Sequence, residues 1–235
     1  MAQTVSRVQG FIRDRRPRQH AAVNVAKIVA MKNDPGLKKI VSSCELVNAD
    51  GMPILWASRL LGNPIPHRVT GVDLFQNLVK LCAEKDYRPF FFGATEWVVK
   101  KTVDEFKERH PGLDVAGYRN GFFTEEQELG IAKMIRDSDA DMLFVGISSP
   151  LKENFLYRWI RFMQVPFCMG VGGGFDIIAG RIKRAPLWVQ RSGMEWFYRI
   201  CQEPQRMWKR YAKTNPVFAW MVLKEYIRLK TQRPG

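Results

Sequence analysis

Three consecutive glycines, Gly172, Gly173 and Gly174, interrupt the most chemically suggestive stretch of the chain. An apolar run, Val165–Met169, precedes them and reads as a buried strand, while Phe175–Ile178 reads as the start of a short helix. Glycine reaches positive φ and lets a ligand approach the backbone, and free N–H groups at a helix start attract phosphate. The pattern suits a diphosphate, and the alternative is a tight turn without a ligand.

Three polar residues earlier in the chain could act on a sugar or phosphate. Asp50 sits where a strand-like segment meets Gly51, so its carboxylate could take a proton from a hydroxyl or could cap the helix that begins near Met52. Asn24 ends a short strand and could hold a sugar hydroxyl, or serve only as a turn residue. Arg68 lies in a loop and could neutralise phosphate, or remain solvated.

A lysine and a glutamate, Lys152 and Glu153, begin the helix that follows Ser149-Pro150. Glu153 suits the positive end of a helix dipole, whereas Lys152 does not, which hints that an anion visits this end. The three histidines are not spaced as metal ligands, and we see no DxD pair of the kind that holds a metal-bound nucleotide and no P-loop lysine. We therefore expect neither a metal ion nor another cofactor.

Alternating strands and helices must position these side chains. The predicted strands cover 88–92, 113–118, 142–146 and 165–169, and the helices between them cover 95–109, 124–138 and 152–163. Thr124 and Gln127 are spaced as a capping box at the start of the second of these helices. Such units form a Rossmann-like α/β fold, a parallel sheet with helices on both faces, whose ligands bind at the carboxyl ends of the strands. Asp50, Gly93, 148–152 and 172–176 should then share one rim.

The C-terminal segment, 186–235, has no strand pattern and reads as helices divided at Pro204 and Pro216. Its aromatic residues interleave with Lys and Arg, as in helices that lie on anionic lipid, although the aromatics could instead pack onto the domain. We expect three parts: a basic N-terminal lead at 1–19, an α/β core at 20–185, and this helical membrane-associating appendage at 186–235.

Charge is concentrated at the two ends of the 235-residue chain, whose net charge is +14. Residues 1–19 contain five Arg and one Asp, and residues 181–235 contain thirteen Lys or Arg and three Glu, so the middle is neutral. Basic ends on a neutral body indicate a localised anionic partner. The sequence shows no membrane-spanning run, no signal peptide and no paired cysteine motif, so we expect a cytoplasmic protein with reduced thiols.

Seven motifs together resemble the WecG/TagA/CpsF family of bacterial glycosyltransferases (family 26). They are NADG at 48–51, RVTGVDL at 68–74, FFGA at 91–94, LFVGISSPLKE at 143–153, GVGGGFDIIAG at 170–180, KRAPLW at 183–188 and GMEWFYRICQEPQRMWKRY at 193–211.

The resemblance implies a reaction and its partners. Members transfer a sugar from a UDP-sugar to the 4-hydroxyl of a glucosamine-type sugar on a polyprenyl diphosphate, with inversion, without metal, at the cytoplasmic membrane face. The donor is UDP-N-acetylmannosamine, its uronate or UDP-glucose.

By the same resemblance, Asp50 is the general base, Asn24 and Arg68 are active-site contacts, and the glycine turn with Asp176 forms the nucleotide site. The basic appendage docks on the membrane and lends arginines to the active site. The candidates here are Arg199, Arg206 and Arg210.

Two departures from the family pattern put the donor sugar in question: Ala22 replaces a threonine and Lys152 replaces a glutamine. The lysine could pair with the diphosphate or with a uronate carboxylate. Two alternatives therefore stay open, a non-catalytic family member in an assembly complex and a nucleic-acid-binding protein that uses the basic tail. The preferred interpretation involves no nucleic acid and leaves a homo-oligomer open.

Overall fold

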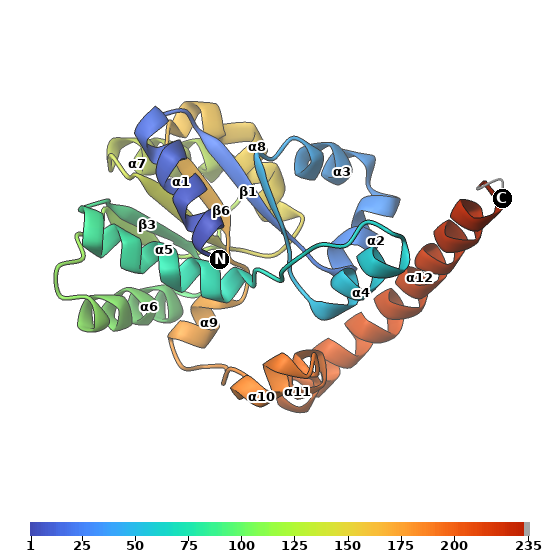
Figure 1. The fold of residues 1–235 in the computed structure, drawn as a ribbon. Coiled ribbons are helices and arrows are strands. Elements are labelled where there is room, and N and C mark those ends of the chain that lie inside the picture. The colour runs from blue at the N-terminus through green and yellow to red at the C-terminus, as the bar shows by residue number, and fades with distance from the viewer. Residues whose placement is uncertain (233–235) are drawn as a thin grey trace. The chain divides into compact units, whose positions relative to one another are not determined.

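The computed structural model describes residues 1–232, apart from the side chains of Arg191 and Arg206. It contains one six-stranded sheet, with the strand order β2-β1-β6-β5-β3-β4 (Figure 1). The strands are β1 (Arg18–Val23), β2 (Leu46–Ala49), β3 (Pro89–Gly93), β4 (Gly117–Arg119), β5 (Met142–Gly146) and β6 (Phe167–Gly170). The pairs β1–β6, β6–β5, β5–β3 and β3–β4 are parallel, which confirms the Rossmann-like α/β fold.

Helices connect these strands along the whole chain. They are α1 (Ala2–Asp14), α2 (Val25–Asn33), α3 (Pro35–Ser42), α4 (Met52–Leu60), α5 (Gly71–Lys85), α6 (Glu96–Arg109), the 3₁₀ turn η1 (Glu125–Gln127), α7 (Glu128–Asp137), α8 (Leu151–Met163), α9 (Gly174–Ile178), α10 (Leu187–Arg191), α11 (Glu195–Gln202) and α12 (Pro204–Thr231). No helix among residues 1–232 combines the length and apolar character that crossing a membrane requires.

The chain separates into two compact units. The first contains residues 1–22, 39–47 and 71–183, and the second contains residues 23–38, 48–70 and 184–235. The three-part division expected from the sequence stays a prediction, because it divides the chain into consecutive segments and the compact units are defined by contacts in space. The compact units instead join segments that are distant in sequence.

Both faces of the sheet in the first unit are covered by helices (Figure 1). Phe90 and Phe92 point to one face and pack with Phe155 of α8 in a fully buried cluster. Phe91 points to the opposite face, where its ring lies 5.9 Å from that of Phe106 in α6. This alternation follows from the two-residue period of a strand, and apolar residues on both faces are the mark of a buried parallel strand.

The basic lead is not an extended tail, because α1 buries Val8, Phe11 and Ile12. The Phe11 ring stacks 6.4 Å from Phe167 of β6, and the Arg18 guanidinium lies 4.7 Å from the centre of the Phe11 ring. Part of the N-terminal positive charge therefore covers aromatic surface of the first unit.

The prediction for strand 113–118 was largely wrong. Leu113 instead donates to the carbonyl of His110 in a turn that ends α6, and β4 starts only at Gly117. Gly117 pairs with Phe90, and a Cβ there would lie 2.7 Å from the Phe90 ring. Close packing against β3 therefore decides where this strand begins.

The regular secondary structure of the second unit is helical, apart from the last residues of β1 and β2. In this unit α12 packs against α2 and α11. Pro204 begins α12 as predicted, but the expected division at Pro216 is wrong, since the helix runs through it to Thr231. Packing against neighbouring helices stabilises the helix more than the proline weakens it.

Candidate active site

Two backbone hydrogen bonds in the second unit bring together three residues that the sequence separates widely. The N–H of Asp50 donates to the carbonyl of Val23 at 2.7 Å, which places Asn24 next to Asp50. The N–H of Val69 donates to the carbonyl of Ala49 at 3.3 Å, which places Arg68 on the other side. Asn24, Asp50 and Arg68 thus form one polar group.

Asn24 and Asp50 differ in whether they cap the helix that follows them. The side-chain oxygen of Asn24 accepts from the N–H of Lys27 at 3.0 Å and caps α2, so this residue has a structural role in addition to its expected ligand contact. The residue before α4 is Gly51, with no side-chain cap hydrogen bond. The alternative role of Asp50 as a helix cap is therefore not the one seen.

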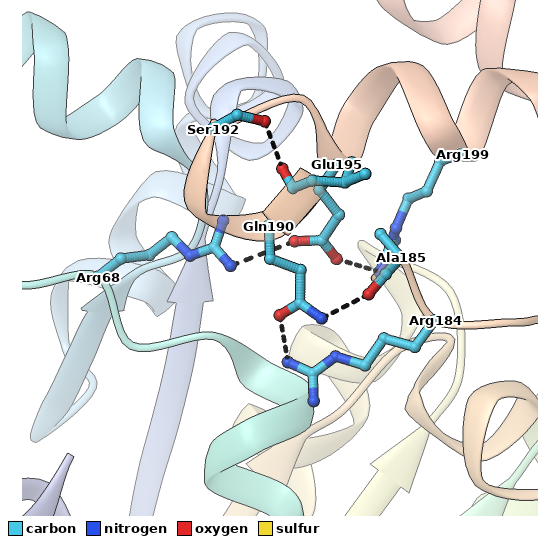
Figure 2. Close-up of polar contacts among 8 residues, drawn as sticks. Arg68, Arg184, Ala185, Gln190, Ser192, Glu195 and Arg199 are labelled. Atoms are coloured by element: carbon cyan, nitrogen blue, oxygen red, sulfur yellow. Dashed lines mark hydrogen bonds and ion pairs between the residues drawn. The ribbon is translucent and has the colours of Figure 1, made fainter. Parts of the chain in front are cut away.

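One carboxylate joins Arg68 to the C-terminal segment of the same unit. Glu195 accepts from Arg68 at 3.2 Å and pairs with Arg199 at 3.6 Å (Figure 2). The Arg68 side chain is only 15% exposed, so it is not the solvated loop arginine that the sequence left open. The structure thus brings Asp50, Arg68 and Arg199 together.

A second polar network orders the chain just before Glu195. Arg184 donates to the side-chain oxygen of Gln190 at 3.1 Å, and the Gln190 amide donates to the carbonyl of Ala185 at 2.6 Å (Figure 2). Gly193, at φ +77°, lies close enough to Met52 that a Cβ would approach it within 3.1 Å. These contacts fix the turn that leads into α11 against α4.

Burial raises the pKa of the Asp50 carboxyl above its ordinary value. Removal from water is the largest influence on this pKa; Arg199 lowers it, Glu195 raises it, and Arg68 and Lys27 lower it further. A carboxylate with a raised pKa binds a proton more readily than an ordinary aspartate, as a general base requires.

Tyr211 of α12 also belongs to this group. Burial raises the pKa of its hydroxyl, while Arg199 and Arg210 lower it and Glu195 and Asp50 raise it. Its ring lies edge-on to Trp196, with centroids 6.1 Å apart. Tyr211 is therefore a neutral hydroxyl near neutral pH, available as a hydrogen-bond donor or acceptor.

The tail arginines do not all take the same position. Arg199 meets Glu195, whereas Arg210 is exposed and interacts with Tyr211. Arg206 lies in α12, but its side chain is outside the described part of the chain.

The glycine turn belongs to the first unit, and its three glycines differ in backbone conformation and in their surroundings. Gly172 takes φ +54°, and a Cβ on it would meet nothing within 4 Å, so the space beside it is open. Gly173 precedes α9, and Gly174 packs where a Cβ would lie 3.5 Å from Phe75. Only Gly172 therefore uses the left-handed backbone that the glycines allow.

Lys152 and Glu153 form a buried pair in the first unit. The two charged groups are 3.2 Å apart, and their side chains are only 11% and 3% exposed. The Lys152 stem lies so close to Gly170, at the end of β6, that a Cβ there would be 2.7 Å from it. The lysine is thus held at the carboxyl end of the sheet by glycine on one side and a carboxylate on the other.

Asp176 follows the glycine turn and makes an ion pair of its own. Its carboxylate lies 3.1 Å from Arg181, and its carbonyl accepts from Ile182 at 3.1 Å. Its side chain is 21% exposed, so the carboxylate is reachable from solvent. Because these residues and Asp50 belong to different units, the single rim expected from the sequence stays a prediction.

Three members of the Asp50 group were not predicted as site residues: Lys27, Glu195 and Tyr211. The available signal for Glu195 was its position four residues before Arg199, which places both on one helix face. Among residues 1–232, no cluster of three or more His, Cys, Asp or Glu side chains could hold a metal ion.

Comparison with known proteins adds a second line of evidence. The Glycosyl transferase WecG/TagA/CpsF family matches the chain over residues 1–232, which confirms the resemblance seen in the motifs. Three relatives carry the name N-acetylglucosaminyldiphosphoundecaprenol N-acetyl-beta-D-mannosaminyltransferase. The Bacillus spizizenii relative is 34% identical over 83% of this chain and 74% of its own length, and the Bacillus subtilis relative 34% over 91% and 82%. The Staphylococcus aureus (strain MW2) relative is 28% identical over 82% of this chain and 74% of its own length.

Proposed function

Since the chain belongs to the Glycosyl transferase WecG/TagA/CpsF family, we propose that it moves an N-acetylmannosamine-type sugar from a UDP-sugar to a sugar on a polyprenyl diphosphate. It is a glycosyltransferase, and its relatives are named for transfer of N-acetylmannosamine to N-acetylglucosaminyldiphosphoundecaprenol. One observation carries the proposal: a half-buried aspartate, Asp50, whose pKa is raised by desolvation, lies beside two arginines that a single glutamate holds.

Asp50 is the proposed general base. Its carboxylate takes the proton of the acceptor hydroxyl while the hydroxyl oxygen bonds to the anomeric carbon of the donor. The bond from that carbon to the UDP oxygen breaks in the same step, so UDP leaves with the bonding electron pair. In-line attack of this kind inverts the anomeric centre.

Arg68 and Arg199 are the proposed partners of the diphosphate. Negative charge grows on the leaving oxygen during the reaction, and guanidinium groups held in place before the reaction stabilise it without reorganisation. Lys27 adds a third positive charge that acts on Asp50. These cations support transfer without a metal ion, which activity in the presence of a chelator would test.

The first unit contributes the proposed nucleotide-binding elements. The open space beside Gly172 and the partly exposed carboxylate of Asp176 are suited to a ribose or a base, and Lys152 offers a cation to an acidic donor. N-acetylmannosamine is the donor sugar that the relatives' names favour. The uronate and glucose remain the competing donors for the assay below.

The C-terminal helices are the proposed membrane-binding surface. The exposed apolar residues Trp220, Leu223 and Ile227 lie at i, i+3 and i+7 of α12, so they share one face, and Lys224 is exposed among them. Trp188 of α10 is 73% exposed. Apolar side chains with neighbouring cations suit the interface of an anionic bilayer, where a polyprenyl-linked acceptor resides. The proposed site of action is therefore the inner face of the cell membrane.

A donor panel tests the function directly. Purified protein is incubated with an N-acetylglucosaminyl-diphosphoprenyl acceptor and with UDP-N-acetylmannosamine, its uronate or UDP-glucose, with and without chelator, and released UDP is measured. Acceptor-dependent UDP release supports the proposal and identifies the donor. Release with none of the donors would leave the non-catalytic assembly role.

The nucleic-acid alternative is separated by binding. Affinity for vesicles with anionic lipid, without comparable affinity for DNA or RNA at physiological salt, is expected, since nucleic-acid binding uses the same basic and aromatic residues.

A further inference from the structure

Glu195 holds two arginines with one carboxylate. Its Oε2 atom accepts from a terminal nitrogen of Arg68 at 3.2 Å, and its Oε1 atom lies 3.6 Å from a terminal nitrogen of Arg199 (Figure 2). Arg68 comes from the loop after α4, while Glu195 and Arg199 come from successive turns of α11. Both oxygens of the carboxylate are therefore used, one for each arginine.

Glu195 contacts only part of each guanidinium. A guanidinium group carries five N–H donors, and each arginine contacts Glu195 through one terminal nitrogen. The remaining donors can bind the oxygens of a diphosphate. Two guanidinium groups near each other repel, so a shared carboxylate between them is what allows both to stay in place.

From these contacts we infer that Glu195 is a positioning residue for sugar transfer, which orients Arg68 and Arg199 beside Asp50 for the departing diphosphate. This inference rests on the function proposed above. Glu195 itself touches the two arginines and need not touch either substrate.

The charges around Asp50 support a second consequence. Arg199 and Glu195 face it from α11, Arg68 from the loop before α5, Lys27 from α2, and the Tyr211 hydroxyl from α12. The cations lower the pKa of the Asp50 carboxyl, and Glu195 is the carboxylate that opposes them. Removing the Glu195 charge should therefore lower the pKa of the base as well as release one arginine.

Two other roles would explain the same contacts. Glu195 could be an internal competitor that occupies the anion site until the donor displaces it, in which case its removal would tighten UDP binding and preserve turnover. It could also be a structural tie between the loop and α11, in which case its removal would lower stability and leave the pH dependence of the remaining activity unchanged.

The variants Glu195→Gln and Glu195→Asp distinguish these roles. Glutamine keeps the shape but removes the charge and replaces one of the two acceptor oxygens with an NH2 donor, which cannot bind an arginine, whereas aspartate keeps the charge on a shorter stem. The readouts are kcat, the KM for the donor, the pH profile of kcat/KM, UDP binding by calorimetry and thermal unfolding. Glu225→Gln is the matched control, because Glu225 pairs with Arg228 on α12 about 21 Å along the helix from Tyr211.

For Glu195→Gln we expect kcat to fall by about 10- to 100-fold, since small errors in position are costly in catalysis. We also expect a higher KM for the donor and an acidic limb of kcat/KM displaced to lower pH. Glu195→Asp should recover part of kcat and keep the limb near its wild-type position. If the glutamine variant does not fold, kcat and the pH profile of Glu195→Asp are compared directly with those of the wild type.

Unchanged kcat in Glu195→Gln, tighter UDP binding with preserved turnover, or a loss of activity with an unmoved acidic limb would each overturn the inference. The first of these, with an active wild type, leaves the proposed function standing. A wild-type protein without transfer activity would overturn both.

Discussion

Replacing Asp50 with asparagine removes the proposed base while keeping the shape of the side chain. An amide cannot take up the acceptor proton, and general-base catalysis contributes about 10²–10⁴-fold to a rate. Because each tenfold change corresponds to about 1.36 kcal/mol, the barrier should rise by about 2.7–5.4 kcal/mol. Arg68 and Arg199 stay in place on Glu195, so binding of UDP should be retained.

The assay measures UDP release at saturating donor and acceptor, together with UDP binding by calorimetry. Asp34→Asn is the matched control in the same unit. The Asp34 carboxylate accepts from the N–H of Leu37 at 2.9 Å at the start of α3, and asparagine caps a helix equally well. The control should keep wild-type turnover. A rate for Asp50→Asn within about tenfold of wild type would refute the assignment of the base.

The raised pKa of the Asp50 carboxyl predicts opposite pH dependences for the activity and the stability of the wild-type protein. Activity requires the deprotonated base, so kcat/KM should rise with pH through an acidic limb that lies above the ordinary aspartate value of about 3.9. Stability should change the other way. The unfolded aspartate loses its proton at lower pH than the folded one, so the free energy of unfolding decreases as pH rises between the two values.

At pH 7 the Asp50→Asn protein should therefore unfold at a higher temperature than wild type. The neighbouring cations do not reverse this expectation, because the pKa is raised after their effect is included. A lower unfolding temperature for Asp50→Asn than for wild type at pH 7 would contradict the proposed cost of burying the charge.

Four further substitutions test other parts of the structure. Trp220→Ser should weaken binding to anionic vesicles in a sedimentation assay without altering UDP binding, because Trp220 is 63% exposed on α12. Gly93→Ala should lower the free energy of unfolding by about 2–6 kcal/mol in denaturant titration, since φ is +141° and the Cβ would lie 2.5 Å from Gly146. Gly10→Ala, with nothing within 4 Å, should instead stabilise by about 0.5–1 kcal/mol. Lys152→Gln should reduce kcat/KM for a uronate donor by about 10- to 100-fold more than for UDP-N-acetylmannosamine, and equal losses would assign the lysine to the diphosphate.

Strands buried on both faces were recognisable in the sequence because each is a short apolar run. The predicted strand 142–146 has the bounds that the structure shows for β5. The capping box predicted at Thr124 and Gln127 is also confirmed, since its two reciprocal hydrogen bonds depend only on residues three apart. Local chemistry of this kind is readable without a structure.

The predictions that were wrong concern element bounds that depend on contacts with segments distant in the sequence. Strand β4 is short because Phe90 and Gly117 must pack together, and α12 continues through Pro216 because other helices support it. The large apolar side chains of the tail also divide between buried and exposed positions in a way that their spacing did not reveal. Met207 is buried, whereas Trp208 next to it is 64% exposed.

The sequence by itself determined the parallel α/β fold, the family, and the residue types available for sugar transfer, because these are carried by local patterns and motifs. Only the tertiary structure decided that Arg68 pairs with Glu195, 127 positions away, and that burial raises the pKa of Asp50. The physical reason is that ion pairing and desolvation depend on distance and packing in space. Neither is encoded in the spacing of residues along the chain.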